Sequence, residues 1–261
     1  MWIAINMTAN SYLNNTWVYN ASSPNCFDGT TDAQCLTIRG GLYDPSTSTT
    51  ASERVSVTEA GGDTSDTERA VGTHIWFNEW TKDSLQAGNV TLEDFPIGMP
   101  GFDFAGIFNT QANIGLGRNS TILNALKDAG HISSRTYSYW WGLNSAAEAN
   151  SMDGQIVFGG YDAAKVKGAN FTQKLLPSSL ACPSGMYLTI TNMELGFPNG
   201  TKADMLAPST LSACVRLDWP AIASLRYDPF MRRFEDLTGT FKAENGPTPP
   251  WDVPAYRFAG Q

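Results

Sequence analysis

Residues with catalytic potential are few and widely spaced in this chain of 261 residues. Two histidines, His74 and His131, stand alone in predicted structural positions, a strand and the end of a helix. The sequence has no Gly-x-Ser-x-Gly elbow, no His-Glu-x-x-His motif and no Walker phosphate loop. We therefore expect no metal and no other cofactor.

The four cysteines form one close pair and one distant pair. A zinc site would need tighter spacing or nearby histidines, which these cysteines lack. The simplest of three possible pairings closes two local loops, Cys26 with Cys35 and Cys182 with Cys214. Four buried free thiols are the alternative.

Asn-x-Ser/Thr sequons are frequent, and charged residues are scarce, at 16% of the chain against roughly 25% in an average domain. The sequons lie at Asn6, Asn14, Asn20, Asn89, Asn119, Asn170 and Asn199. Together they predict a secreted, disulfide-bonded glycoprotein whose glycans supply solubility. Because Met1 leads directly into a strand-like segment, we expect the secretory leader to precede the sequence given.

Charge and hydropathy exclude several partners. The net charge is −8, the pI is near 4.7, and basic residues do not cluster, which argues against nucleic acid and anionic membrane surfaces. The sequence has no run of about 18 apolar residues, the length that a membrane-spanning helix needs. We expect a monomer.

Short β-rich runs separated by turn residues predict an all-β architecture. The predicted strands cover residues 2–7, 16–19, 54–58, 74–80, 88–92, 155–159 and 187–195. Helices are predicted only over residues 120–129 and 229–237, from capping residues and apolar spacing. A composition shift after residue 174 predicts two lobes, residues 1–175 and 176–261.

Five landmarks in the first 168 residues occur in the order found in one known family. They are Thr16-Trp-Val, the pair Cys26 and Cys35, Gly41-Leu-Tyr-Asp-Pro-Ser-Thr-Ser-Thr-Thr, the segment starting Asn113-Ile-Gly-Leu-Gly, and Asp153-Gly-Gln-Ile-Val-Phe-Gly-Gly-Tyr-Asp. The chain thereby resembles the pepsin-like aspartic peptidases (peptidase A1), in the style of divergent secreted fungal members. The resemblance implies a bilobal, all-β acid protease fold of β-barrel lobes with a few short helices and a peptide-binding cleft. Residues 175–261 match more loosely, so we expect an incomplete second lobe.

The family's mechanism uses two aspartates, one in an Asp-Thr/Ser-Gly turn of each lobe, which share a proton so that one acts as acid and the other as base. This sequence has neither motif. Family spacing back from Trp17 assigns the first aspartate position to Asn10, or to Met7 if the loop carries an insertion. The first acidic residue in the chain is Asp28, so the first carboxylate is missing under either alignment.

The second aspartate position falls on Arg216, after Cys214 and one aliphatic residue. Arginine cannot be deprotonated to serve as a base. Asp218 is a weak candidate two residues further on, because it lacks the Thr-Gly that would orient it. One carboxylate cannot supply a chemistry that needs two.

The flap over the cleft should lie near Trp76, Phe77 and Trp80, where the family has a Tyr-Gly pair. These aromatics either form a lid over a retained groove or simply pack a β-hairpin; the second is the simpler interpretation.

The sequence thus predicts a secreted, pepsin-like pseudopeptidase that retains a cleft for a peptide or secreted protein. Two alternatives stay open: an active aspartic-type endopeptidase, and a binding or inhibitor module or cell-wall glycoprotein. The presence or absence of paired carboxylates separates the enzyme from the others.

Overall fold

The structure is a computed structural model that describes residues 2–3, 7–20, 40–65, 79–99, 112–140, 154–177, 179, 181–206, 210–217, 229–230 and 232–239. The chain divides into two compact units. The first comprises Met1–Met186 and Val215–Trp219, and the second comprises Tyr187–Cys214 and Pro220–Gln261. The division into lobes 1–175 and 176–261 stays a prediction.

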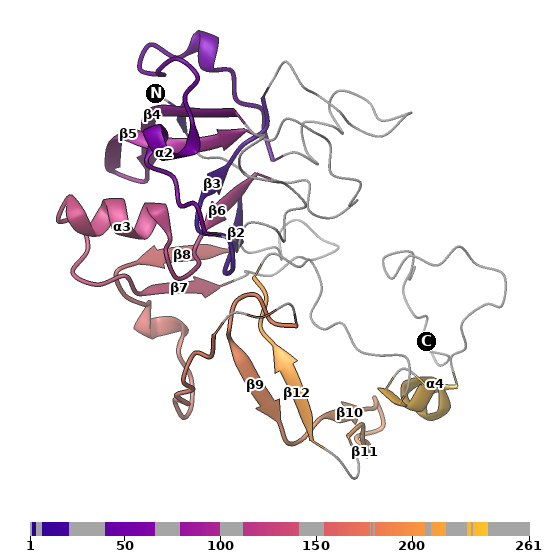
Figure 1. Cartoon of the computed structure of the whole chain (residues 1–261). Coiled ribbons are helices and arrows are strands. Elements are labelled where there is room, and N and C mark those ends of the chain that lie inside the picture. Colours follow the sequence, from indigo (N-terminus) through magenta and orange to yellow (C-terminus); the bar gives the residue numbers. More distant parts are fainter. Residues whose placement is uncertain are drawn as a thin grey trace, which may run out of the picture. The chain divides into compact units, whose positions relative to one another are not determined.

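A mixed β-sheet organises the first unit (Figure 1). Within the described residues it has six strands in the order β1-β4-β5-β3-β6-β2. Their bounds are β1 Trp2–Ile3, β2 Thr8–Asn10, β3 Thr16–Trp17, β4 Glu79–Ala87, β5 Val90–Met99 and β6 Asn113–Gly115. The short strand β2 pairs in parallel with β6, and β3 lies between β5 and β6. This arrangement brings the residues around Asn10 beside a segment 100 residues away in sequence.

The two longest strands, β4 and β5, form an antiparallel hairpin whose turn is Gly88 and Asn89. Gly88 has a φ of 63°, a conformation that costs glycine little. The register shifts between Asp83 and Leu85, opposite Asp94, which itself has a φ of 51°. The turn and this β-bulge fix which β4 and β5 side chains face the core.

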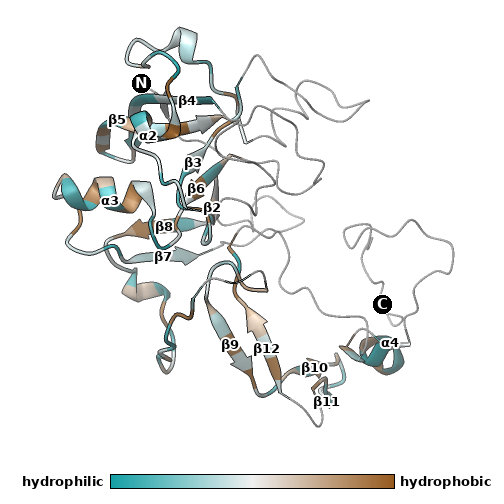
Figure 2. Ribbon diagram, in the orientation of Figure 1, coloured by the Kyte–Doolittle hydropathy of each residue, from teal (hydrophilic) through white to brown (hydrophobic). Residues whose placement is uncertain are grey.

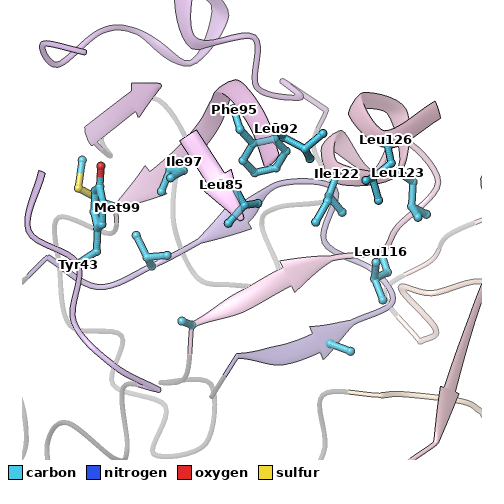
Figure 3. Packing of buried hydrophobic residues seen from close by; sticks show 13 residues of the cluster. Tyr43, Leu85, Leu92, Phe95, Ile97, Met99, Leu116, Ile122, Leu123 and Leu126 are labelled. Carbon is cyan, nitrogen blue, oxygen red and sulfur yellow. The ribbon is translucent and has the colours of Figure 1, made fainter. Parts of the chain in front are cut away.

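The main hydrophobic cluster lies between the β4–β5 hairpin, β6 and helix α3, Thr121–Asp128. Figure 3 shows Ile122, Leu123 and Leu126 of α3 together with Leu92 and Phe95 of the hairpin. The helix begins where predicted, because Ser120 caps it by accepting a hydrogen bond from Leu123 N at 3.2 Å. Gly130, with a φ of 76°, follows its end.

A second, aromatic cluster lies beside the main one and is built around Trp17 and Trp80. The two rings meet edge to face, with centroids 4.9 Å apart and planes at 63°. Gly98 has no side chain to separate the strand from Trp17, and a Cβ there would lie 2.7 Å from that ring. The glycine is therefore part of the packing.

One predicted strand, residues 54–58, is wrong. Only Val55 makes a bridge, to Trp80, and a short helix, α2 Val57–Ala60, begins immediately afterwards. Ser56 and Glu59 form a reciprocal capping box, which satisfies backbone donors that a strand would have left to a neighbour. The Ser-x-x-Glu signal outweighed the β-propensity of the valines.

Among its described residues, the first unit also has a pair of strands and two 3-10 turns. β7 Tyr137–Trp140 pairs antiparallel with β8 Gln155–Phe158, which lies in the strand predicted over residues 155–159. The turns are η1 Pro45–Thr47 and η5 Ala163–Lys165, capped by Asp44 and Asp162. Each cap side chain accepts a backbone N–H, as Asp does in turns.

In the part of the second unit that the structure describes, there are two small antiparallel sheets and a helix. The sheets pair β9 Tyr187–Ile190 with β12 Leu211–Cys214, and β10 Glu194–Gly196 with β11 Lys202–Asp204. The helix is α4 Arg232–Thr238, which is largely hydrophilic in Figure 2. Strands outnumber short helices throughout the described ranges, which confirms the all-β prediction. No helix in these ranges is both long and apolar enough to cross a membrane.

Candidate active site

The first predicted catalytic position lies at the end of β2, where Asn10 pairs with Gly115 of β6. The backbone then turns through residues 11–15 and returns as β3, whose Trp17 pairs with Asn113. Gly115 allows this close approach, because a Cβ there would lie 2.3 Å from the carbonyl oxygen of Asn15. The turn is thus held against β6 by its backbone.

The side chain of Asn10 makes hydrogen bonds both within this turn and to β6. It is 2% exposed. Its Oδ1 accepts hydrogen bonds from Tyr12 N at 3.1 Å and Leu13 N at 3.2 Å, and its Nδ2 donates to Asn113 Oδ1 at 3.3 Å. Asn10 therefore orders the turn as an acceptor. Met7, the alternative position, is half-buried and packs against the main hydrophobic cluster.

The two residues after Asn10 are buried as well. Tyr12 is 4% exposed and belongs to the aromatic cluster, and Ser11 is equally inaccessible. The structure gives the hydroxyl of Ser11 no hydrogen-bond partner in the residues it describes. Three consecutive residues of the turn thus present almost no side-chain surface to solvent.

The second predicted position, Arg216, contacts this same turn. Its Nη2 donates to the hydroxyl of Tyr12 at 3.3 Å, and its guanidinium carbon lies 5.1 Å from the centre of the Tyr12 ring. This is a cation–π geometry. The structure therefore brings Asn10, Tyr12 and Arg216 into one connected group, although Arg216 follows Tyr12 by 204 residues. Asp218 lies outside the described residues.

This group has no acid–base pair. An amide does not titrate in the working range of a protein, and a guanidinium stays protonated. Among the described residues, no group of three or more His, Cys, Asp or Glu side chains could hold a metal ion. The described chemistry of the site is hydrogen bonding and cation–π contact.

Behind the turn lies a polar network that the sequence analysis did not single out. Asn14 donates from Nδ2 to Asp63 Oδ1 at 3.1 Å and to Ser65 Oγ at 2.9 Å, and its Oδ1 accepts from Asn119 N at 3.0 Å. Asn15 exchanges two hydrogen bonds with the backbone of Asp63, at 2.7 and 2.8 Å. These amides join the turn, the loop after α2 and the start of α3. No local pattern signals them, because their partners are distant in sequence.

A single buried carboxylate, Asp83 on β4, organises a second polar network. Tyr43 and Ser48 donate to it at 2.7 and 3.0 Å, Ser84 N donates at 2.7 Å, and Thr50 also donates. Burial tends to raise the pKa of Asp83, but these hydrogen bonds outweigh burial and hold it below its usual value. Burial, followed by the bond to Asp83, raises the pKa of Tyr43. The network attaches the loop around η1 to the sheet.

Of the three aromatics predicted near the flap, the structure describes Trp80 alone. It is 1% exposed and packs on Trp17, so it is a core residue and not part of a lid. The packing alternative therefore applies to Trp80. Trp76 and Phe77 lie outside the described residues.

The predicted glycosylation sites separate into two groups by exposure. Asn89, Asn119, Asn170 and Asn199 are exposed. Asn14 and Asn20 are buried, at 2% and 6% exposed, so we expect no glycan at either position on the folded chain. Which of the seven sequons are used stays a prediction. Asn6 lies outside the described residues.

Both described cysteines, Cys182 and Cys214, are disulfide-bonded, as their predicted pairing requires. The zinc and free-thiol alternatives therefore do not apply to them. Cys26 and Cys35 lie outside the described residues, so their pairing stays a prediction.

Comparison with known proteins assigns the family. Residues 13–194, more than half of the chain, match the sequence profile of the eukaryotic aspartyl proteases, and the chain belongs to this family. It is similar to the probable aspartic-type endopeptidase OPSB of Arthroderma benhamiae, with 27% identity over 194 residues, and equally to the protein of that name from Trichophyton verrucosum. The alignments cover 69% of this chain but only 35% of each relative. The chain thus spans about a third of the length of these curated relatives.

A solved structure also resembles the chain. The crystal structure of the aspartic proteinase from Irpex lacteus aligns with a TM-score of 0.48 and 17% identity, covering 92% of this chain and 62% of that one.

Proposed function

We propose that this chain is a catalytically inactive, secreted member of the eukaryotic aspartyl protease family, a pepsin-like pseudopeptidase that retains a cleft for a peptide or secreted protein. The observation that carries the proposal is the group formed by Asn10, Tyr12 and Arg216. At the two positions where the family resemblance expects aspartates, this group has an amide and a guanidinium.

The chemistry of peptide hydrolysis in this family explains why that exchange matters. Two carboxylates must share one proton, so that the ionised member activates water while the protonated member acts as acid. Neither Asn10 nor Arg216 can fill either role near neutral or acidic pH. Asp83 is a buried carboxylate of the first unit, but its hydrogen bonds tie it to the loop around η1 and not to Asn10 or Arg216.

Accessibility supports the same conclusion. A catalytic side chain must reach the substrate within hydrogen-bonding distance. Asn10 is buried, and its amide is used by Tyr12, Leu13 and Asn113. The turn therefore has a scaffolding role in this proposal.

Secretion is supported by the disulfide-bonded state of Cys182 and Cys214 and by the exposure of Asn89, Asn119, Asn170 and Asn199. Retention of a binding cleft is supported by the family match over residues 13–194, since the resemblance to this family implies a peptide-binding cleft. Binding is a role that a family scaffold can retain after its chemistry is lost.

Incubation of the purified glycoprotein with acid-denatured haemoglobin at pH 3–5 tests the proposal, with and without pepstatin. We expect no cleavage above the buffer control, while an active aspartic peptidase at equal concentration digests the substrate. Because two curated relatives are named probable aspartic-type endopeptidases, pepstatin-sensitive cleavage is the informative opposite result. That result would overturn the proposal in favour of an active endopeptidase.

A further inference from the structure

Three consecutive residues after β12, which belong to the first unit, are held within it by three different kinds of contact. Val215 is held by its backbone, donating from N to Met186 O at 2.9 Å and accepting from Ser184 Oγ at 2.9 Å. Leu217 packs against the main hydrophobic cluster. Arg216, between them, directs its side chain to Tyr12.

The contact between Arg216 and Tyr12 has the geometry of a cation–π pair. The guanidinium carbon is 5.1 Å from the ring centre, inside the limit of about 6 Å for such pairs. Tyr12 is buried and Arg216 is half-buried, so water screens the contact less than it would at the surface. The Nη2-to-hydroxyl bond at 3.3 Å fixes the orientation of the guanidinium.

Besides its contact with Arg216, Tyr12 is held in place in two ways. Its ring belongs to the aromatic cluster with Trp17 and Trp80. Its backbone N–H is bound by Asn10 Oδ1 at 3.1 Å. The result is a continuous chain of contacts from β2 through Tyr12 to the segment after β12.

We propose that Arg216 and Tyr12 form a clasp that fastens residues 215–217 to the turn after β2 and takes the structural place of the acid–base pair. This inference rests on the proposed function and deepens it, because it assigns a structural use to Arg216, which stands at one of the two dyad positions, and to Tyr12, two residues after the other. A pair of carboxylates changes its charge as pH falls, but arginine and tyrosine keep theirs from pH 3 to pH 8. The clasp therefore holds equally at neutral and acidic pH.

A double-mutant cycle on the intact chain tests the clasp, using Arg216→Gln, Tyr12→Leu and the double variant. We expect each single change to lower the Tm by about 2–4 °C, as loss of a desolvated cation–π contact does in a protein of this size. The double variant should lose little more than the worse single one, because both remove the same contact. The matched control is Arg135→Ala, at an exposed arginine of the same unit.

Two further measurements separate the clasp from general damage. Amide hydrogen exchange should speed up at Val215 in Arg216→Gln, while the amides of α3 stay protected. Tyr12→Phe keeps the ring and loses the hydroxyl, so its Tm should lie between those of the native protein and Tyr12→Leu. If Tyr12→Leu fails to fold, Tyr12→Phe with Arg216→Lys completes the cycle, since lysine lacks the planar group that stacks.

Repeating the cycle at pH 4 and pH 7 should give the same coupling. If the losses of Tm in the cycle are additive, the clasp is overturned. Coupling that disappears at pH 4 would also overturn it, by showing that a carboxylate holds Arg216. These results do not depend on the haemoglobin assay. Cleavage of haemoglobin would overturn the assignment as inactive but not the clasp. Additive losses of Tm would overturn the clasp but not the assignment as inactive.

Discussion

Buried polar side chains in the first unit act as structural ties between distant segments. Asn10 and Asp83 illustrate this role, since each accepts hydrogen bonds from backbone or hydroxyl donors that would otherwise be buried without partners. Leaving such donors unsatisfied costs about 1–3 kcal/mol each. Substitutions at these positions should therefore change stability before they change any function.

Restoring carboxylates at the two family positions should not restore proteolysis. In the double variant Asn10→Asp with Arg216→Asp, Tyr12 still fills the position of the motif's glycine, and Ser11 is buried without a described partner. We expect cleavage of denatured haemoglobin at pH 3–5 to stay at the background level, together with a lower Tm because the Tyr12 contact is lost. Measurable pepstatin-sensitive cleavage would show that the turn tolerates catalysis after all.

Asp83→Asn should destabilise the protein in a pH-dependent way. The folded-state pKa of Asp83 is lowered, so its contribution is complete above the usual Asp pKa of about 3.9 and is lost as pH falls through the folded value. We expect a loss of about 1–3 kcal/mol in unfolding free energy at pH 6–7. The difference from the native protein should narrow below pH ~4.

Urea unfolding at pH 3, 5 and 7 measures this effect. Glu53→Gln, an exposed carboxylate on the neighbouring loop, is the control and should change little at any pH. A constant difference between Asp83→Asn and the native protein from pH 3 to pH 7 would contradict an ionised Asp83.

At the scale of elements, the sequence predicted helix ends correctly where the capping interaction joins residues close together in the chain. Ser120 caps α3 and Gly130 follows its end, as the sequence predicts. The strand predicted over residues 54–58 is wrong because the capping box of Ser56 and Glu59, also a local signal, favours a helix there. Caps are readable from sequence because donor and acceptor are three residues apart.

Ser120→Ala tests how far one cap supports the sheet. Ser120 accepts from Leu123 N at 3.2 Å and donates to Gly115 O at 2.6 Å, so it joins α3 to β6. Loss of both bonds should lower the unfolding free energy by about 1–2 kcal/mol, measured by urea unfolding. Ser133→Ala, at an exposed serine beyond the helix, should leave the unfolding free energy nearly unchanged. Equal losses of unfolding free energy in the two variants would contradict a specific contribution of the cap.

At the scale of the whole molecule, the limit of sequence reasoning is long-range contact. Spacing from Trp17 and Cys214 identified Asn10 and Arg216 separately, but no local pattern could show that Arg216 stacks on Tyr12. The same limit applies to the sequons, because a motif of three residues contains no information on burial. Asn14 matches the motif as well as Asn170 does, yet it lies inside a polar network.

This difference predicts which sequons carry glycans on the folded, secreted protein. Asn89, Asn119, Asn170 and Asn199 should be modified, and Asn14 and Asn20 should not, because their burial excludes a sugar. Peptide mapping after enzymatic deglycosylation in heavy-oxygen water marks every formerly modified asparagine as a labelled aspartate. A glycan at Asn14 on correctly folded protein would contradict the packing around it.

A matched pair of variants separates the two roles of asparagine. Asn14→Gln should leave the glycan mass unchanged and lower the unfolding free energy by about 2–4 kcal/mol, because the longer side chain cannot keep the bonds to Asp63, Ser65 and Asn119. Asn170→Gln should remove one glycan and leave the unfolding free energy nearly unchanged, since this residue is exposed outside any strand or helix. Intact mass and urea unfolding of the same samples measure both quantities. The opposite pattern, mass loss at Asn14 or instability at Asn170, would mean that burial does not decide glycosylation here.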